Sequence, residues 1–270
     1  MAFNENTRVK IPAILHLNRM GYKYLSLSNA KWDQSTNIFT NILSESLIRI
    51  NPDVELDEIK KAQEKVFLVL DNEDLGQEFY KQLTSTSGVR LIDFKDFSNN
   101  SFHVVTELPY KNGDEEFRPD ITLLINGMPL VFIEVKKPNN REGILAERDR
   151  INVRFKNKKF KKFINISQIL VFSNNMEYDT ESIVPIQGAF YSTTSYEQAS
   201  FNCFREEKAQ NLSKVLVSAV EDNENLVLKD TNLSSIKFSP EFIANKDTNT
   251  PTNRILTSLF SKDRLEMILK

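Results

Sequence analysis

Apolar residues at helical spacing dominate the first third of this chain. Residues 34–50 place five aliphatic side chains on one face of a predicted helix: Ile38, Ile42, Leu43, Leu47 and Ile50. The apolar spacing also predicts helices over residues 7–20, 55–70 and 74–83. We expect this helical section to pack around a sheet that the following residues form.

Short apolar runs between turn residues predict a strand-rich middle section. The runs lie near residues 89–94, 101–108, 118–125, 130–136, 168–173 and 186–191. Helices are predicted over residues 141–163, 208–221 and 254–269, the last after a polar breaker at residues 245–253. This alternation indicates an α/β fold, with a mixed central sheet flanked by helices and the extra helical section at the N-terminus.

Asn126-Gly127 separates two apolar runs and is a strong signal for a hairpin turn. Because side chains alternate along a strand, six aliphatic residues should share the core face of this hairpin: Ile121, Leu123, Ile125, Val131, Ile133 and Val135. The opposite face then carries Asp120, Thr122, Leu124, Phe132, Glu134 and Lys136. An ideal two-residue turn would pair Asp120 with Ile133 and bring the faces into conflict. We therefore predict an odd-length or bulged turn at Gly127.

Asp120, Glu134 and Lys136 are charged residues in segments that otherwise read as buried strands. Buried carboxylates are costly or shift their pKa, so at least one of the two acids should have a raised pKa. Two carboxylates on adjacent strands can hold one or two Mg²⁺ ions, which prefer oxygen ligands and assist phosphodiester hydrolysis. Lys136 can orient the nucleophile or neutralise charge on the phosphate. The alternative is a surface Glu134–Lys136 pair at a strand end, with Asp120 in a turn after Pro119.

A basic segment follows these residues along the chain. Eight cationic residues lie between positions 148 and 162, with Asp149 as their one acidic neighbour: Arg148, Arg150, Arg154, Lys156, Lys158, Lys159, Lys161 and Lys162. A basic helix beside an acidic metal site can follow a DNA backbone and offset repulsion between phosphates and carboxylates. We predict DNA contacts from all of them except Lys156. A solvated lysine face is the alternative.

Composition limits the classes of function. A net charge of −2 and a pI near 5.9 mean that attraction to nucleic acid has to come from a local patch. The single cysteine, Cys203, excludes a disulfide framework and a cysteine-based zinc site, and suits a reducing cytoplasm. His16 and His103 lack metal-binding spacing and are interpreted as structural. The sequence shows no signal peptide, membrane span or glycine-rich phosphate loop, so we expect a cytoplasmic protein without a membrane partner.

Pro119-Asp120 with Glu134-Val135-Lys136 resembles the PD-(D/E)xK signature of nucleases. With residues 100–107, 118–122 and 126–136, it resembles the N-terminal nuclease domain of the R (restriction and translocation) subunit of type I restriction-modification enzymes. The run from Asn126 to Lys136 is the most specific part, and residues 169–175 resemble the strand that follows the catalytic hairpin. The resemblance covers roughly residues 1–240 and is dense between 99 and 175.

This resemblance implies a PD-(D/E)xK restriction-endonuclease-like core that cleaves double-stranded DNA with Mg²⁺, or with Mn²⁺ instead. It implies Asp120 and Glu134 as metal ligands, Lys136 as the catalytic lysine and Glu5 as an accessory glutamate from an early helix. It also implies that ATP is used only through a motor domain absent from this chain, and that modification and specificity subunits are partners.

The same resemblance suggests how the chain is divided. We assign residues 1–243 to the nuclease domain, with a helical section at 1–86 and the catalytic core at 87–195. Residues 244–270, the polar breaker and the last helix, are expected to lead toward the motor domain.

One feature departs from the family pattern. The family commonly has a Gln-x-x-x-Tyr element on the helix after the catalytic lysine, and here Glu147 and Ile151 stand at that spacing. Glu147 can still form hydrogen bonds as an accessory residue, but Ile151 cannot. Two hypotheses therefore remain: a Mg²⁺-dependent endonuclease, and a non-cutting module with a relic site that docks DNA or partner subunits. Metal binding at Asp120 and Glu134 would discriminate between them.

Overall fold

A seven-stranded mixed sheet lies at the centre of the computed structural model, which describes residues 4–138, 140, 142–181, 183, 187–194, 200–205, 211–216 and 221–270. Its strands are β1 (Lys23–Tyr24), β2 (Phe102–Thr106), β5 (Ile121–Ile125), β6 (Met128–Val135), β7 (Ile169–Ser173), β8 (Ala189–Ser192) and β9 (Asn202–Cys203), in this order across the sheet. β1 runs parallel to β2 and β6 parallel to β7, while the other neighbouring pairs are antiparallel. The predicted α/β fold with a mixed central sheet is confirmed.

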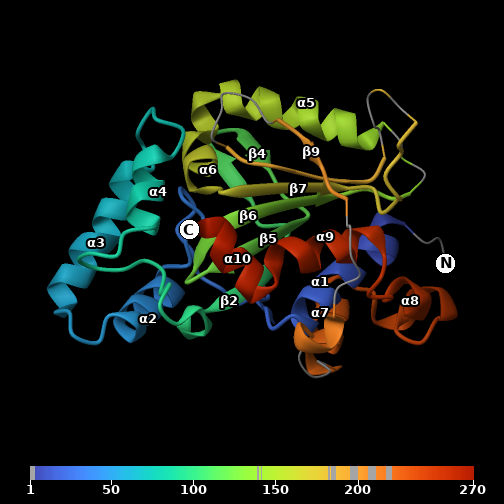
Figure 1. Ribbon diagram of the computed structural model, residues 1–270, viewed down its shortest axis with the longest axis horizontal. Helices are drawn as coiled ribbons and strands as arrows, with labels where there is room; N and C mark the ends of the chain where they lie inside the picture. Colours follow the sequence, from blue (N-terminus) through green and yellow to red (C-terminus); the bar gives the residue numbers. More distant parts are fainter. Residues whose placement is uncertain are drawn as a thin grey trace.

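Helices cover both faces of the sheet in three layers (Figure 1). One face carries α5 (Gly143–Lys156) and α6 (Lys161–Ile166). The other carries α1 (Ile11–Arg19), α9 (Pro251–Phe260) and α10 (Lys262–Leu269), with α7 (Glu221–Asp230) and α8 (Pro240–Asn245) near α1. The remaining helices, α2 (Thr40–Ile50), α3 (Leu56–Val69) and α4 (Gln77–Leu83), lie together at one end of the molecule. The helical section at the N-terminus thus packs around the sheet, as predicted.

The sheet separates two apolar cores, and strand parity decides which core each residue enters. The larger core contains all six aliphatic residues that the alternation assigns to the inner hairpin face: Ile121, Leu123, Ile125, Val131, Ile133 and Val135. Helices α1, α9 and α10 contribute residues such as Ile14, Leu256 and Leu265 to it. The smaller core, beneath α5 and α6, contains Leu124 and Phe132 from the hairpin. The predicted assignment of faces is confirmed.

A bulge in β6 sets its register against β5. Pro129 faces Leu124 while Val131 faces Leu123, so Leu130 is an extra residue of β6. Proline has no N–H for a ladder, and bulges are one of the places where a sheet accommodates it. The hairpin has the bulge that the assignment of faces requires, but the prediction of an odd-length or bulged turn at Gly127 is wrong, because the turn has two residues and the extra residue lies within β6. The shifted register, continued by one step, brings the two candidate carboxylates to opposite positions on adjacent strands.

The turn of this hairpin is fixed by neighbouring segments. Asn126 and Gly127 have φ values of 50° and 81°, as a type I′ turn requires. The Asn126 side chain donates to the carbonyl of Leu91 at 2.9 Å and accepts from the N–H of Ser101 at 2.8 Å. The N–H of Phe39 donates to the carbonyl of Gly127 at 2.9 Å. The turn is therefore tied both to the segment before β2 and to the start of α2.

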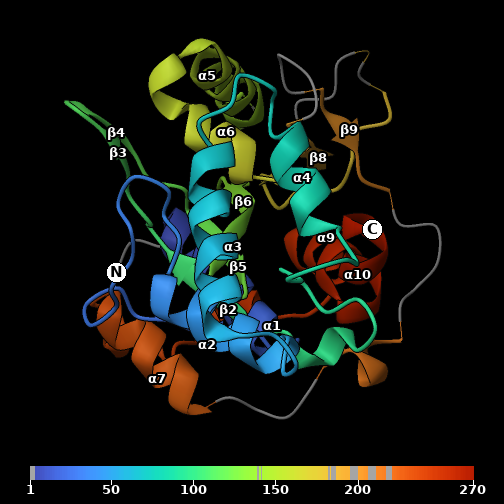
Figure 2. The same ribbon diagram turned by 90° about the vertical axis from the view of Figure 1, so that its left-hand side faces the viewer.

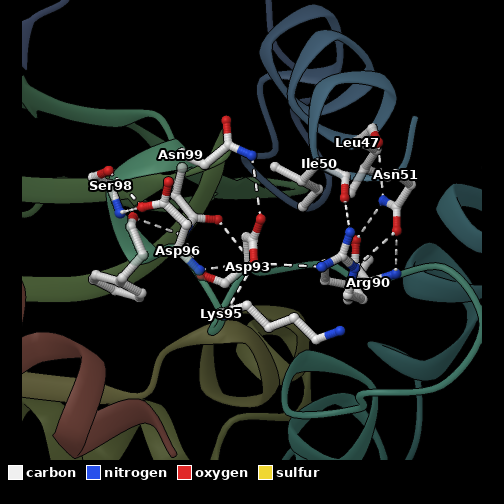
Figure 3. A network of polar contacts seen from close by, with 12 residues as sticks. Leu47, Ile50, Asn51, Arg90, Asp93, Lys95, Asp96, Ser98 and Asn99 are labelled. Atoms are coloured by element: carbon white, nitrogen blue, oxygen red, sulfur yellow. Dashed lines mark hydrogen bonds and ion pairs between the residues drawn. The ribbon is translucent and has the colours of Figure 1, made fainter. Parts of the chain in front are cut away.

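The predicted strand at residues 89–94 is wrong, because side chains hold this segment in an irregular conformation (Figure 3). Asp93 accepts hydrogen bonds from the backbone N–H groups of Lys95 at 3.0 Å and Asp96 at 3.2 Å. The Asn51 side chain accepts from the N–H of Arg90 at 2.9 Å. These bonds satisfy backbone groups that a ladder would otherwise satisfy, so the apolar residues of the segment enter the core without forming a strand.

Two predicted helices are each divided into two. The helix predicted over residues 141–163 ends at Lys156, because Asn157 is extended (φ −91°, ψ 106°) and its side chain accepts from the N–H of Lys159 at 3.0 Å. Asparagine side chains compete with the helical backbone in this way. The helix predicted over residues 254–269 consists of α9 and α10, separated at Ser261, which has ψ of 141°. Both of these helices contribute to the larger core.

Other boundaries differ for local reasons. The helix predicted from residue 34 begins at Thr40, because Asp33 accepts from the N–H groups of Ser35 at 3.1 Å and Thr36 at 2.9 Å in a turn. Of the helix predicted over residues 208–221, the described residues 211–216 contain a 3₁₀ turn at Leu212–Lys214, and 206–210 and 217–220 lie outside the described residues. The helix predicted over residues 55–70 matches α3.

A two-stranded hairpin that the sequence pattern does not predict precedes β5 (Figure 2). Its strands, β3 (Tyr110–Asn112) and β4 (Glu115–Phe117), project away from the main sheet. Phe117 anchors its base by stacking on Tyr110 at a ring-centroid distance of 5.1 Å and meeting Phe163 edge-on at 4.9 Å. Strands of three residues are too short to show a periodic pattern.

Gly127→Ala should destabilise the fold strongly. A Cβ atom here would lie 2.7 Å from the carbonyl oxygen of Phe39 and 2.9 Å from the nitrogen of Leu43, at a φ of 81°. We expect the free energy of unfolding in urea to fall by about 3 kcal/mol or more. Gly113→Ala is the matched control, since its φ is 64° but nothing lies within 4 Å of the added atom; about 1–2 kcal/mol is expected there. Equal losses in the two variants would contradict the close approach at Gly127.

Candidate active site

Asp120 and Glu134 approach each other at the end of the β5–β6 hairpin. Asp120 precedes β5 and its side chain is 11% exposed, while that of Glu134, near the end of β6, is 12% exposed. The N–H of Val135 donates to Oδ2 of Asp120 at 2.9 Å, and the N–H of Asp120 donates to Oε2 of Glu134 at 3.4 Å. Each carboxylate is thus held by backbone of the opposite strand, so both are fixed on one side of the hairpin.

Lys136 joins this pair from the same face of the hairpin. Its Nζ donates to Oε1 of Glu134 at 2.9 Å and lies 3.9 Å from Oδ2 of Asp120. The side chain is 13% exposed, so the three charged groups share a largely buried space. The structure brings the three predicted site residues together, and the prediction that they point to one face is confirmed.

The two accessory glutamates also lie beside Lys136. Oε1 of Glu147, on α5, lies 3.5 Å from the lysine Nζ, and its side chain is 3% exposed. The same oxygen accepts a hydrogen bond from Arg150. Oε1 of Glu5 lies 3.9 Å from the lysine Nζ, with the side chain 31% exposed. Ile151 is buried in the smaller core and cannot join this polar cluster.

Lys10 and Glu107 are site residues that the sequence analysis did not identify. Lys10 ends a π-helical segment, Asn6–Lys10, which precedes α1. Its Nζ contacts Oδ1 of Asp120 at 3.3 Å and also Oε1 of Glu107. The one sequence signal was a lysine between two apolar residues, Val9 and Ile11, in a predicted helix. Short π-helical segments are frequent at functional sites.

Burial and mutual repulsion govern the protonation of this cluster. Burial, and next the charge of Asp120, raise the pKa of Glu134 to about 8, against the opposing charge of Lys136. The expectation of a raised pKa in one of the two acids is met. Burial alone would lower the pKa of Lys136, but the carboxylates of Glu134 and Asp120 outweigh it and the pKa lies above the ordinary lysine value. Without a bound cation, Lys136 is therefore a charged donor.

The donor set suits Mg²⁺ or Mn²⁺. Asp120 and Glu134 offer carboxylate oxygens, and Mg²⁺ is commonly held by one or two carboxylates while the remaining positions are filled by water and substrate phosphates. Within the described ranges, no three His, Cys, Asp or Glu side chains converge as a ready-made metal cage. A site of this kind fits an ion that keeps several waters and does not fit a four-ligand structural metal such as zinc.

The basic residues predicted to contact DNA fall into two groups. The arginines lie on α5 with Glu147, and the guanidinium of Arg154 stands 4.0 Å from the ring centre of Phe117. Burial lowers the pKa of Arg154, and the charges of Glu134 and Glu147 act in the opposite direction. The helix carries the chain about 14 Å from Glu147 to its end. The lysines follow Asn157, beyond that end of the helix.

Ion pairs surround the basic segment. Arg148 bonds to Asp149 at 3.1 Å, and three lysines form exposed pairs: Lys158 with Glu73 at 2.9 Å, Lys159 with Glu115 at 2.6 Å and Lys162 with Asp71 at 3.4 Å. Exposed pairs of this kind contribute little to stability and exchange readily in water. Such pairs therefore do not prevent these lysines from meeting a phosphate backbone.

His16 has the structural character expected of it. His16 is fully buried and its Nε2 lies 2.7 Å from the hydroxyl of Thr257 on α9. Burial first, and then the charge of Arg19, lower its pKa to about 4. Among the described residues, no helix is long and apolar enough to cross a membrane.

Glu134→Gln should change how stability depends on pH. The raised pKa of Glu134, about 8 against an ordinary 4.5, means that the folded state binds more protons than the unfolded state between these values. Glu134 therefore lowers stability as pH rises through that window. We expect the variant to gain about 1–3 kcal/mol relative to the wild type between pH 5 and pH 9, measured by urea denaturation. Glu64→Gln, at an exposed position of α3, is the control and should track the wild type. Parallel curves for Glu134→Gln and wild type would contradict the assignment.

Comparison with known proteins gives these observations a family context. Residues 2–180 match the family described as the type I restriction enzyme R protein N terminus. The type I restriction enzyme HindI endonuclease subunit of Haemophilus influenzae is 30% identical over 138 residues, which are 44% of this chain and 13% of that protein. A Methanocaldococcus jannaschii protein, whose name gives it as the MjaIXP endonuclease subunit of a type I restriction enzyme, is 28% identical over 201 residues, 64% of this chain and 19% of that protein.

The chain thus spans about a fifth or less of the length of these relatives. The family match covers every residue of the candidate site, from Glu5 to Glu147. The chain belongs to the family of the type I restriction enzyme R protein N terminus.

Proposed function

We propose that this chain is the nuclease module of a type I restriction enzyme R subunit and cleaves phosphodiester bonds of double-stranded DNA with Mg²⁺. The observation that carries the proposal is the convergence of Asp120, Glu134 and Lys136 on one face of a buried hairpin. Relatives named as endonuclease subunits support a nuclease role in general. A purely structural ion pair would not need two carboxylates held together against their repulsion.

Each residue has a distinct part in the proposed reaction. Asp120 and Glu134 would hold the cation, and the N–H of Val135 keeps the Asp120 carboxylate in place through its Oδ2. Bound Mg²⁺ supplies a Lewis acid for the phosphoryl oxygen and lowers the pKa of an attacking water. Lys136, charged and held by Glu134, can donate to the phosphate or to the incoming oxygen.

Glu147 takes the place of the glutamine that is common in the family. A carboxylate 3.5 Å from the Lys136 Nζ strengthens the lysine's positive charge and orients it, which a neutral amide does less strongly. The tyrosine position has no equivalent, because Ile151 is buried in the smaller core. This second departure favours the alternative function, a relic site in a module that docks DNA or partner subunits without cutting.

The proposed role also sets the partners and the location. Double-stranded DNA is the substrate, and modification and specificity subunits would supply sequence recognition, because a site of this kind contacts phosphates rather than base edges. ATP would act through a motor domain outside this chain. A cytoplasmic location suits both the DNA substrate and the free thiol of Cys203.

Plasmid cleavage tests the proposal. With Mg²⁺ or Mn²⁺, the wild-type protein together with its partner subunits should convert supercoiled plasmid to nicked and linear forms. Asp120→Ala should reduce the rate at least about 100-fold, because one of the two ligands is lost. Asp57→Ala is the matched control, since Asp57 lies exposed in the first turn of α3, and it should cleave like the wild type.

The outcomes separate the two functions. Cleavage that needs a divalent cation and is lost in Asp120→Ala supports the nuclease. DNA binding without cleavage in the wild type, unchanged by Asp120→Ala, would overturn the nuclease proposal and favour the docking module.

The lysines after α5 provide a test of the DNA path. Replacing Lys158, Lys159, Lys161 and Lys162 with alanine should weaken binding to all DNA sequences alike, because phosphate contacts carry no base information. The slope of log affinity against log salt should become shallower by about 0.9 for each phosphate that a lysine no longer neutralises. The control replaces exposed lysines elsewhere: Lys60, Lys61, Lys65 and Lys229. If both quadruple variants bind alike, the cluster is a solvated face and DNA runs elsewhere.

A further inference from the structure

Two lysines flank Asp120, one on each carboxylate oxygen. The Nζ of Lys136 lies 3.9 Å from Oδ2, and the Nζ of Lys10 lies 3.3 Å from Oδ1. Lys10 comes from the π-helical segment at the start of the chain and its side chain is 6% exposed. Its ammonium group also contacts Oε1 of Glu107, which follows β2. The proposed reaction assigns no part to Lys10 or Glu107.

A buried lysine is costly unless its charge is paired. The burial of Lys10 therefore depends on its carboxylate partners, Asp120 and Glu107. Burial acts to lower the pKa of Lys10, but Asp120 and Glu107 raise it above the ordinary lysine value. The ammonium group of Lys10 lies 3.3 Å from Oδ1 of Asp120, one of the oxygens that would bind the metal. It therefore occupies space and positive charge beside an oxygen that a divalent cation would approach.

Glu107 is suited to receive the ammonium group. Its side chain is 46% exposed, whereas that of Asp120 is 11% exposed, so its charge costs less to solvate. Its backbone has φ of 55°, an uncommon value for a residue other than glycine, and its N–H donates to the carbonyl of Asp120 at 3.4 Å. This conformation keeps the Glu107 carboxylate beside Asp120.

We propose that Lys10 is a positioning residue that competes with the divalent cation for Asp120. When the cation binds, the carboxylate of Glu107 retains the ammonium group of Lys10. This inference rests on the proposed function, because it presupposes a cation at Asp120 and Glu134. Lys10 neutralises Asp120 when no divalent cation is bound and raises the cation concentration at which the site fills. The Glu107–Lys10 contact sets the size of that effect.

Binding of Mn²⁺, measured by titration calorimetry on the full chain, tests the proposal. Lys10→Met removes the competing charge and should tighten Mn²⁺ binding about tenfold, since a unit charge a few ångströms from the site is worth that much at a partly buried position. Lys10→Arg keeps the charge and is the matched control; it should not tighten binding. Glu107→Gln should weaken binding about three- to tenfold, because Lys10 then has Asp120 as its remaining carboxylate partner.

The double variant separates this effect from general electrostatics. In the Lys10→Met background, Glu107→Gln should no longer weaken Mn²⁺ binding, whereas a simple loss of nearby negative charge would weaken it in both backgrounds. Circular dichroism and thermal unfolding without metal check that each variant is folded. If Lys10→Met does not fold, Glu107→Asp replaces it, changed at a half-exposed side chain that keeps its charge but is one methylene shorter. Weaker Mn²⁺ binding is then expected from the poorer retention of Lys10, and unchanged binding would overturn the role of Lys10.

The failures are distinguishable. Wild-type binding that Asp120→Asn abolishes, combined with unchanged or weaker binding in Lys10→Met and unchanged binding in Glu107→Gln, overturns the role of Lys10 and leaves the nuclease proposal intact. Absence of Mn²⁺ binding in the wild type and in every variant overturns both.

Discussion

The extra residue in β6 controls where the charged side chains of this protein lie. Without Leu130, the ladder that leaves the Asn126-Gly127 turn would place Asp120 opposite Ile133, and a carboxylate would share a face with the larger core. With it, aliphatic residues of both strands face α1 and α9, while Asp120, Glu134 and Lys136 face the side of α5. A register error of one residue would invert every one of these placements. The buried turn, fixed by Leu91, Ser101 and the start of α2, makes such an error costly.

The site itself is a balance of opposite charges in a poorly solvated space. Five carboxylates, from Glu5, Glu107, Asp120, Glu134 and Glu147, surround the ammonium groups of Lys10 and Lys136. Removing either ammonium group leaves carboxylates buried without their partner, which is more costly than the pair is stabilising. Burial, and next the charge of Asp120, raise the pKa of Glu134 in this space. A site with more carboxylates than ammonium groups is suited to bind a cation. Functional sites often keep such unfavourable charge at a cost in stability, because their activity needs it.

The chain shares its family's overall sequence but differs from the common pattern at two positions of α5. The match shows that the chain belongs with the N termini of type I restriction enzyme R proteins, over residues 2–180. The geometry shows how this chain departs from the common pattern, with a charged Glu147 on Lys136 and an apolar Ile151 in the core. Glu147 makes a polar contact to the lysine, whereas Ile151 has no polar side-chain group to offer. Arg150, on the same helix, pairs with Glu147, whereas the lysines come after Asn157, beyond the end of the helix.

Local pattern by itself determined the strands of the hairpin, the parity of their side chains, the need for a bulge and the grouping of Asp120, Glu134 and Lys136, because period-two alternation is a property of neighbouring residues. It failed at residues 89–94, where Asp93 and Asn51 satisfy the backbone with side chains, and at Asn157, whose side chain ends a helix. Only the tertiary structure decided that Lys10 meets Asp120, 110 positions away, and that Glu107 stands beside them. Contacts of that kind depend on how helices and strands pack, and no spacing within a single segment records them.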